Sequence, residues 1–221
     1  MTTDSMQLSF VTWSDVTDDR EDPEFYQPEF LELERSLKKG KALRLDAVAD
    51  FSANTWTPSK TDRPFLYIDI ASVNIRTGDV QPVEMPEADA PSRARRKVRK
   101  GDIIISTVRP DRNAVAYIHD DLDGAVCTNG FAVLTPKEGT DGYALYAFLK
   151  SRFFILQAVR RSTASMYPAV AEECLRDILV PRKIIEGGKE VSEAVRSAFA
   201  EQQRFLARLR EVQTALARLV G

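Results

Sequence analysis

The strongest periodic signal in this 221-residue chain lies near its C-terminal end, where one side of a helix would be almost wholly apolar. The side chains recur at alternating steps of four and three, and they are Val191, Val195, Ala198, Gln202, Phe205, Leu209, Val212, Leu216 and Leu219. This heptad seam predicts a spacer or dimerisation helix over residues 184–221 that pairs with a second helix. About thirty helical residues extend roughly 45 Å, which favours a protruding helix over one lying on its own domain.

A second feature constrains the middle of the chain, at residues 90–110. Six Lys or Arg side chains occupy the eight positions from Arg93 to Lys100, a turn follows at Gly101, and an apolar β-branched run then leads to Arg109. Cationic side chains next to a rigid strand are typical of a surface that binds a polyanion. The alternative is a solvated basic helix that ends at Gly101 and binds nothing.

Charge is unevenly distributed, although the formal net charge is only −2. Residues 1–50 contain twelve acidic and six basic residues, whereas residues 93–112 contain eight basic and two acidic ones. Any nucleic-acid surface is therefore local. The acidic N-terminal extension, residues 1–41 with a short helix at about residues 28–39, points away from DNA or contacts a different partner.

Residues 42–183 have the pattern of a domain built around a mixed or antiparallel sheet. Short β-rich segments alternate with Gly, Asn and Asp turns, and we predict strands at residues 65–70, 101–108, 114–118 and 131–134. A further strand is predicted at residues 8–13, a helix at residues 143–159, and a short amphipathic element at residues 172–180. The expected fold class is α+β, with flanking helices and a long C-terminal coiled-coil-type helix.

The sequence offers little for catalysis. His119 is the single histidine and lies in an acidic turn, and no group of Cys and His residues has metal-ligand spacing. We therefore expect a chain with no catalytic residue, no metal and no cofactor of its own. The enzymatic alternative is a metal-dependent nuclease built on Asp69, Asp102 and Asp111.

Cysteine usage and hydropathy bear on the cellular compartment. The two cysteines, Cys127 and Cys174, are far apart in apolar surroundings and are expected to be free thiols. The N-terminus lacks the pattern of a signal peptide, and no apolar run is long enough to span a membrane. We expect a cytoplasmic protein.

Polar loops with Arg, Asn, Thr, Ser and Tyr recur at the ends of the predicted elements. These residue types contact phosphates and base edges in DNA. With the basic stretch, they predict a double-stranded DNA surface formed by Lys60, Arg63, Arg93, Arg95, Arg96, Arg109, Arg112, Asn113, Arg160, Arg161, Thr163, Ser165 and Tyr167.

Several motifs resemble the target-recognition domain of type I restriction-modification specificity (S) subunits. They are residues 65–74 with Gly78, Arg93-Ala94-Arg95 leading into residues 101–110, residues 129–134, the helix near residues 146–151, and the polar loop 162–167 that precedes residues 175–181. The resemblance covers about residues 42–183, and the heptad helix stands where the family has its spacer helix. Residues 184–189 replace the Pro- and Gln-containing entry to that helix, and residues 1–41 have no counterpart.

The resemblance implies a non-catalytic, sequence-specific DNA-binding subunit that serves phage defence. Family S subunits carry two recognition domains and two long helices that pair antiparallel. They position adenine methyltransferase (M) subunits, which use S-adenosylmethionine, and a restriction (R) subunit. One domain and one helix imply a half-length form in which two chains pair through residues 191–219 and read an interrupted palindrome. The alternative is a recognition module of another phage-defence methyltransferase complex.

Overall fold

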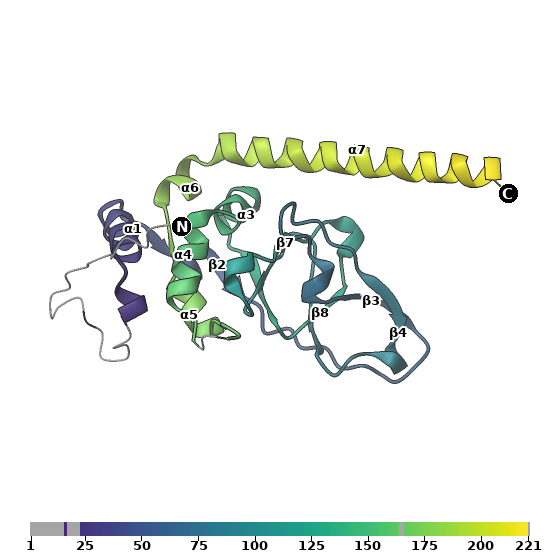
Figure 1. The fold of residues 1–221 in the computed structure, drawn as a ribbon, viewed down its shortest axis with the longest axis horizontal. Helices are drawn as coiled ribbons and strands as arrows, with labels where there is room; N and C mark the ends of the chain where they lie inside the picture. Colours follow the sequence, from purple (N-terminus) through teal and green to yellow (C-terminus); the bar gives the residue numbers. More distant parts are fainter. Residues whose placement is uncertain (1–15, 17–22, 164–165, 221) are drawn as a thin grey trace, which may run out of the picture.

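Two four-stranded sheets form the centre of the molecule (Figure 1), in a computed structural model that describes residues 16, 23–163 and 166–220. The first sheet is antiparallel and has the order β2 (Ala49–Phe51), β9 (Phe131–Pro136), β6 (Ile103–Ser106) and β7 (Val115–Tyr117). The second has the order β4 (Val83–Pro86), β3 (Pro64–Ile68), β8 (Val126–Thr128) and β5 (Ala94–Lys97), with β3 and β8 parallel. A short antiparallel pair, β1 (Leu43–Arg44) with β10 (Leu179–Val180), joins two distant parts of the chain.

The first sheet is the middle layer of the fold. Side chains alternate between the two faces of a strand, and β6 shows this directly. Ile103 and Ile105 pack in a core shared with Leu145 of the helical layer, whereas Ile104 packs in a second core with Ile68 of the other sheet. An apolar run that is buried on both faces therefore holds the helices and the second sheet together.

Short helices cover the outer face of the first sheet, and they are α2 (Leu45–Val48), α3 (Gly142–Leu149), α4 (Arg152–Arg160), α5 (Glu172–Arg176) and α6 (Arg182–Gly187). Helix α1 (Pro28–Lys39) lies outside this layer and packs on α4. The fold class expected from the sequence, α+β with a long C-terminal helix, is confirmed. None of the helices in the described part of the chain has both the length and the apolar character of a membrane span. The strand predicted at residues 8–13 lies outside the described residues.

The predicted single helix at residues 143–159 is wrong, because the chain breaks between α3 and α4. The Lys150 carbonyl accepts a hydrogen bond from Asn113 Nδ2 at 2.9 Å, and Lys150 Nζ donates to the carbonyls of Ile75 and Asn113. The Ser151 hydroxyl donates to the Phe148 carbonyl at 2.6 Å. Long-range hydrogen bonds thus interrupt a segment whose local apolar pattern favours a continuous helix.

The first half of α7 (Lys189–Val220) is anchored to its own domain by a polar contact centred on Asp141. The Asp141 carboxylate caps α3 by accepting from the amides of Tyr143 and Ala144, and it also accepts from the buried Ser192 hydroxyl at 2.8 Å. Burial raises the pKa of Asp141, but these donors outweigh it and leave the pKa below its usual value. The side chain thus stays ionised and fixes the angle at which α7 leaves the domain.

An aromatic contact continues the attachment of α7. The Phe199 ring lies 4.6 Å from the His119 ring and 5.2 Å from the Tyr146 ring, measured between centroids. His119 is half-buried in this contact, and burial lowers its pKa. Val195 and Gln202 of the heptad seam are also partly buried in this region.

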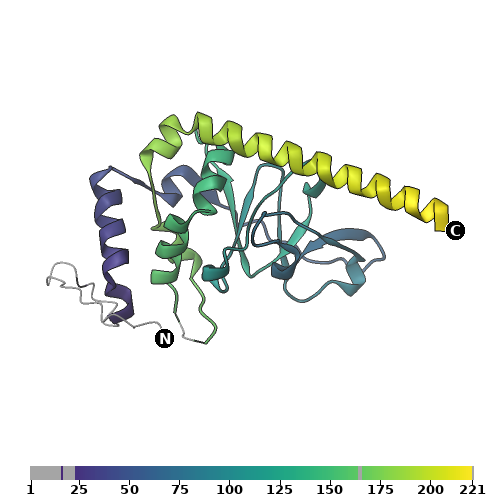
Figure 2. The same ribbon diagram turned by 45° about the horizontal axis from the view of Figure 1, so that its top comes forward.

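The second half of α7 extends past the domain core, above the second sheet (Figures 1 and 2). Its apolar seam is open to solvent, with exposed fractions of 62% at Phe205, 42% at Leu209 and 54% at Leu216. Ala198, Val191, Val212 and Leu219 are exposed as well. The first half of the seam therefore packs partly on its own domain, whereas the second half is uncovered in this single chain.

Candidate nucleic-acid interface

The basic stretch is an exposed edge strand, so the alternative of a solvated helix is wrong. In β5, Ala94 is buried, Arg96 is half-buried, and Arg95 and Lys97 are exposed. The loop before β3 lies along this strand, since the Trp56 amide donates to the Arg95 carbonyl and the Lys97 amide to the Asn54 carbonyl. The backbone of the strand is thereby occupied, and its long side chains project from a fixed support.

Two arginines of this stretch already have acidic partners. Arg96 donates to Glu172 at 3.0 Å and to the Ser52 carbonyl at 2.8 Å, so it ties β5 to α5. Arg93 lies 3.8 Å from the Asp69 carboxylate and remains largely exposed. Arg96 therefore braces the fold in this conformation, while Arg93 keeps much of its surface available.

Other predicted contact residues have no ion pair with any described residue. They are Lys60, Arg63, Arg95, Arg109 and Arg112. Lys97 and Arg99, which belong to the basic run from Arg93 to Lys100, share this property and are exposed. Unpaired cations gain most from phosphate, because no internal ion pair is broken on binding.

Two loops that are far apart in sequence meet beside α4. The Arg109 amide donates to the Pro168 carbonyl at 2.8 Å, and the Val170 amide donates to the Thr107 carbonyl at 2.9 Å. The Arg109 guanidinium lies 5.2 Å from the centroid of the exposed Tyr167 ring. Thr163 is exposed and its backbone pairs with Ala169, whereas Ser165 lies outside the described residues.

Burial corrects the assignment of Arg160 as a DNA contact. Its side chain is 6% exposed, pairs with Glu34 of α1 and donates to the Phe25 carbonyl at 2.9 Å. Its guanidinium also lies 4.1 Å from the centroid of the Phe25 ring. Arg160 thus anchors the N-terminal helix to α4, and sequence alone could not distinguish this brace from a surface cation.

Asn113 and Arg161 are also engaged inside the protein. Asn113 is buried and, with a φ of 51°, donates to the Lys150 carbonyl. Arg161 is partly buried and donates to the carbonyls of Gln157 and Asp177 at 3.2 and 3.4 Å. Asn113 is therefore a structural residue rather than a DNA contact, and only the outer part of Arg161 remains accessible.

The three aspartates of the nuclease alternative have separate roles. Asp69 caps the 3-10 turn Ile70–Ser72, and Asp102 accepts from the Thr135 hydroxyl at 2.7 Å and from the Arg99 amide at 2.8 Å. Burial raises the pKa of Asp102 above its usual value, although these donors oppose that effect. Asp111 belongs to the exposed turn Pro110–Arg112. Within the described residues, no group of three or more His, Cys, Asp and Glu side chains could hold a metal ion.

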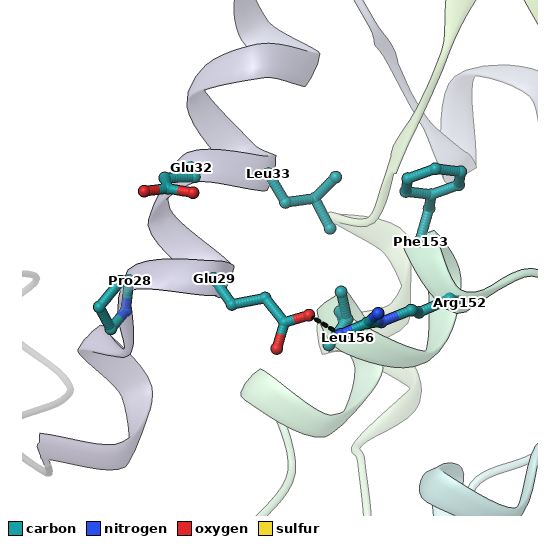
Figure 3. A pocket seen from close by; sticks show the side chains of 7 residues that line it. All are labelled: Pro28, Glu29, Glu32, Leu33, Arg152, Phe153 and Leu156. Carbon is teal, nitrogen blue, oxygen red and sulfur yellow. Dashed lines mark hydrogen bonds and ion pairs between the residues drawn. The ribbon is translucent and has the colours of Figure 1, made fainter. Parts of the chain in front are cut away.

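A groove of about 660 Å³ lies between α1 and α4 (Figure 3). Its lining residues are Pro28, Glu29, Glu32, Leu33, Arg152, Phe153 and Leu156. Glu29 reaches across the groove to Arg152, which leaves the Glu32 carboxylate as the other charge on this surface. Because the groove carries the negative charge of Glu32, it would repel the phosphates of DNA.

Comparisons with known proteins find similarity to proteins of type I restriction-modification systems. A scan against models of protein families gives no match. Over 84 residues, the chain is 26% identical to the type I restriction enzyme HindI specificity subunit of Haemophilus influenzae, a match that covers 38% of this chain and 17% of that protein.

Two solved structures share the fold. One is a chain from a structure that addresses complex assembly and conformational transition of the type I R-M system, with a TM-score of 0.62 and 30% identity over 76% of this chain. The other is the HsdS subunit from Thermoanaerobacter tengcongensis, with a TM-score of 0.58 and 29% identity over 77% of this chain. The chain covers 44% and 43% of these two structures, less than half of each.

Proposed function

Because this chain carries a target-recognition domain of the type I restriction-modification specificity-subunit kind, followed by a long helix, we propose that it is a DNA-specificity subunit. The observation that supports this most strongly is the set of unpaired cations on β5 and the neighbouring loops. They stand on rigid backbone and are free to neutralise phosphates. The protein would bind double-stranded DNA and perform no chemistry of its own.

The chemistry would come from partner subunits. An adenine methyltransferase that holds S-adenosylmethionine would be positioned on the bound site, and a restriction subunit would complete a full complex. The groove between α1 and α4 carries two glutamates, and the sequence of residues 1–41 is acidic, so both suit a protein partner rather than a polyanion. The alternative assembly is another phage-defence methyltransferase complex.

Two copies would pair along the whole of α7, through the exposed seam of its second half and the exposed Val191 and Ala198 of its first half. Its first half, residues 189–203, carries three glutamates and two basic residues, whereas residues 204–218 carry four arginines and one glutamate. An antiparallel pair sets the acidic half of each helix against the basic half of the other, and a parallel pair would align like charges. Charge therefore favours a two-fold dimer that presents two recognition domains to an interrupted palindrome.

Replacing Arg95, Arg109 and Arg112 with alanine should weaken DNA binding and flatten its salt dependence. If each side chain neutralises one phosphate, the slope of log K against log salt concentration should fall by about 2 to 3. Fluorescence anisotropy with a labelled duplex, titrated at several salt concentrations, measures this slope.

A matched control removes three exposed charges from α1, α6 and the start of α7, by Lys39→Ala, Lys183→Ala and Lys189→Ala. This control should keep the wild-type slope. An unchanged slope in the arginine variant, or an equal fall in the control, would overturn the proposed DNA surface.

A further inference from the structure

The two loops that meet beside α4 form a well-supported projection, which we call the paired tip: Thr107–Arg109 with Met166–Val170. Besides the two backbone bonds between these segments, the Thr163 and Ala169 amides and carbonyls bond to each other at 2.8 and 3.1 Å. The Ser106 hydroxyl donates to the Val108 carbonyl at 2.8 Å. The tip is thus fixed by hydrogen bonds at its base.

The paired tip presents large apolar side chains to solvent. Met166 is 79% exposed, Tyr167 is 66% exposed and Val108 is 38% exposed. Three such side chains on two adjacent loops make an apolar projection, whereas Val83, for example, is exposed on β4 of the second sheet. Exposed apolar groups that gather on one projection indicate a binding surface.

Cations accompany this apolar surface. The Arg109 guanidinium lies over the Tyr167 ring, and Arg112 is exposed in the turn that follows. Arg109 adopts a φ of 49° although it is not glycine, and Asn113 at the other end of the turn adopts 51°. Such backbone is costly for residues with a Cβ, and Asn113 is held in it by its bond to the Lys150 carbonyl. The turn is built to present arginines beside the apolar side chains.

The paired tip lies on the side of the molecule opposite α7. In Figures 1 and 2, α7 runs along one side, while the chain before α5 projects on the other. The ion pair between Arg96 and Glu172 links α5 to the basic strand β5. The helix that follows the tip is therefore tied to the basic strand β5, and the tip itself lies away from α7.

We propose that the paired tip is a wedge that distorts duplex DNA. Met166 and Tyr167 enter between two base pairs from the minor groove, and Arg109 and Arg112 contact the flanking phosphates. Proteins that bend DNA use apolar side chains in this way, since partial unstacking lets the bent duplex contact more of the protein. The proposal rests on the proposed function and specifies how the recognition domain treats its DNA.

A pre-distorted duplex tests the wedge without knowledge of the target sequence. The probes are two fluorescent duplexes of about 30 base pairs with the same sequence, one intact and one with a single-nucleotide bulge. A bulge removes part of the cost of unstacking, so the full-length protein should bind the bulged duplex about tenfold more tightly. The double variant Met166→Ser and Tyr167→Ser should bind both duplexes equally, with the salt slope of the wild-type protein.

Control variants test whether the preference for the bulged duplex depends on the tip itself or on exposed apolar surface in general. The double variant Met166→Leu and Tyr167→Phe should keep the preference, and so should Val83→Ser, which removes an exposed apolar side chain from β4. Absence of preference in the wild-type protein, or its persistence in the serine variant of the tip, would overturn the wedge while leaving DNA binding intact. Failure to bind either duplex would instead overturn the proposed function.

Discussion

Arginine at both Leu209 and Leu216 should convert a dimer into a monomer and lower the affinity for a two-half-site DNA by a factor of about 10² to 10⁴. Both side chains lie on the uncovered seam of α7, with exposed fractions of 42% and 54%. The two added charges in each helix would be buried against the apolar seam of the partner helix, which an antiparallel pair cannot accommodate without a large desolvation cost. The loss arises because each recognition domain must then bind its half-site without the help of the other.

The matched control places arginine at Ala207 and Thr214, which are exposed and lie outside the seam. Light scattering should show a dimer for this control and for the wild-type protein, and a monomer for the seam variant. Circular dichroism should give the same helix content for all three. A seam variant that stays dimeric, or a wild-type protein that is monomeric at high concentration, would contradict self-pairing.

The substitution Arg160→Met should lower the free energy of unfolding by about 3 kcal/mol. It leaves Glu34 without its buried partner and removes the donor to the Phe25 carbonyl. Burial raises the pKa of Glu34, but Lys38 and Arg160 outweigh it and hold the pKa below its usual value. Urea unfolding followed by circular dichroism measures the loss. A double variant with Glu34→Leu should recover part of it, because an apolar pair of similar size replaces the partly buried ion pair.

The Arg160→Met variant also tests whether Arg160 stabilises the fold or contacts DNA. Because Arg160 is 6% exposed, we expect DNA affinity of the folded Arg160→Met protein to change less than about twofold, which is small beside the effect of losing a phosphate contact. Unchanged unfolding together with a large loss of DNA affinity would show that Arg160 acts at the DNA surface and that its burial in α4 is misassigned.

The sequence pattern correctly predicted the helices and strands whose structure depends mainly on residues nearby in the sequence. Pro28 at the first turn and Gly40 after the last predict the bounds of α1, which are Pro28–Lys39. The β-branched run at residues 103–105 similarly predicts a buried strand. The heptad pattern predicts α7, because one face of a helix repeats over its full length.

Tertiary partners decided the rest. The division of residues 143–159 into two helices depends on Asn113 and Lys150, whose hydrogen bonds join segments far apart in sequence. Arg160 and Arg161 are adjacent and chemically alike, yet only the first is enclosed by α1. Likewise, Val195 and Leu209 occupy the same seam, and the domain beneath α7 covers only the former. Residue type and spacing therefore predicted most of the elements, whereas only the fold shows which cations are buried in ion pairs and which are exposed without one.

The central claim, a two-fold dimer that reads DNA sequence, is tested most directly by sequencing duplexes that the purified chain selects from a random pool. The account predicts enrichment of one short motif in two inverted copies at a fixed spacing, since the two recognition domains are related by the symmetry of the α7 pair. A pool that stays random after repeated selection, or a single asymmetric motif without an inverted copy, would contradict it.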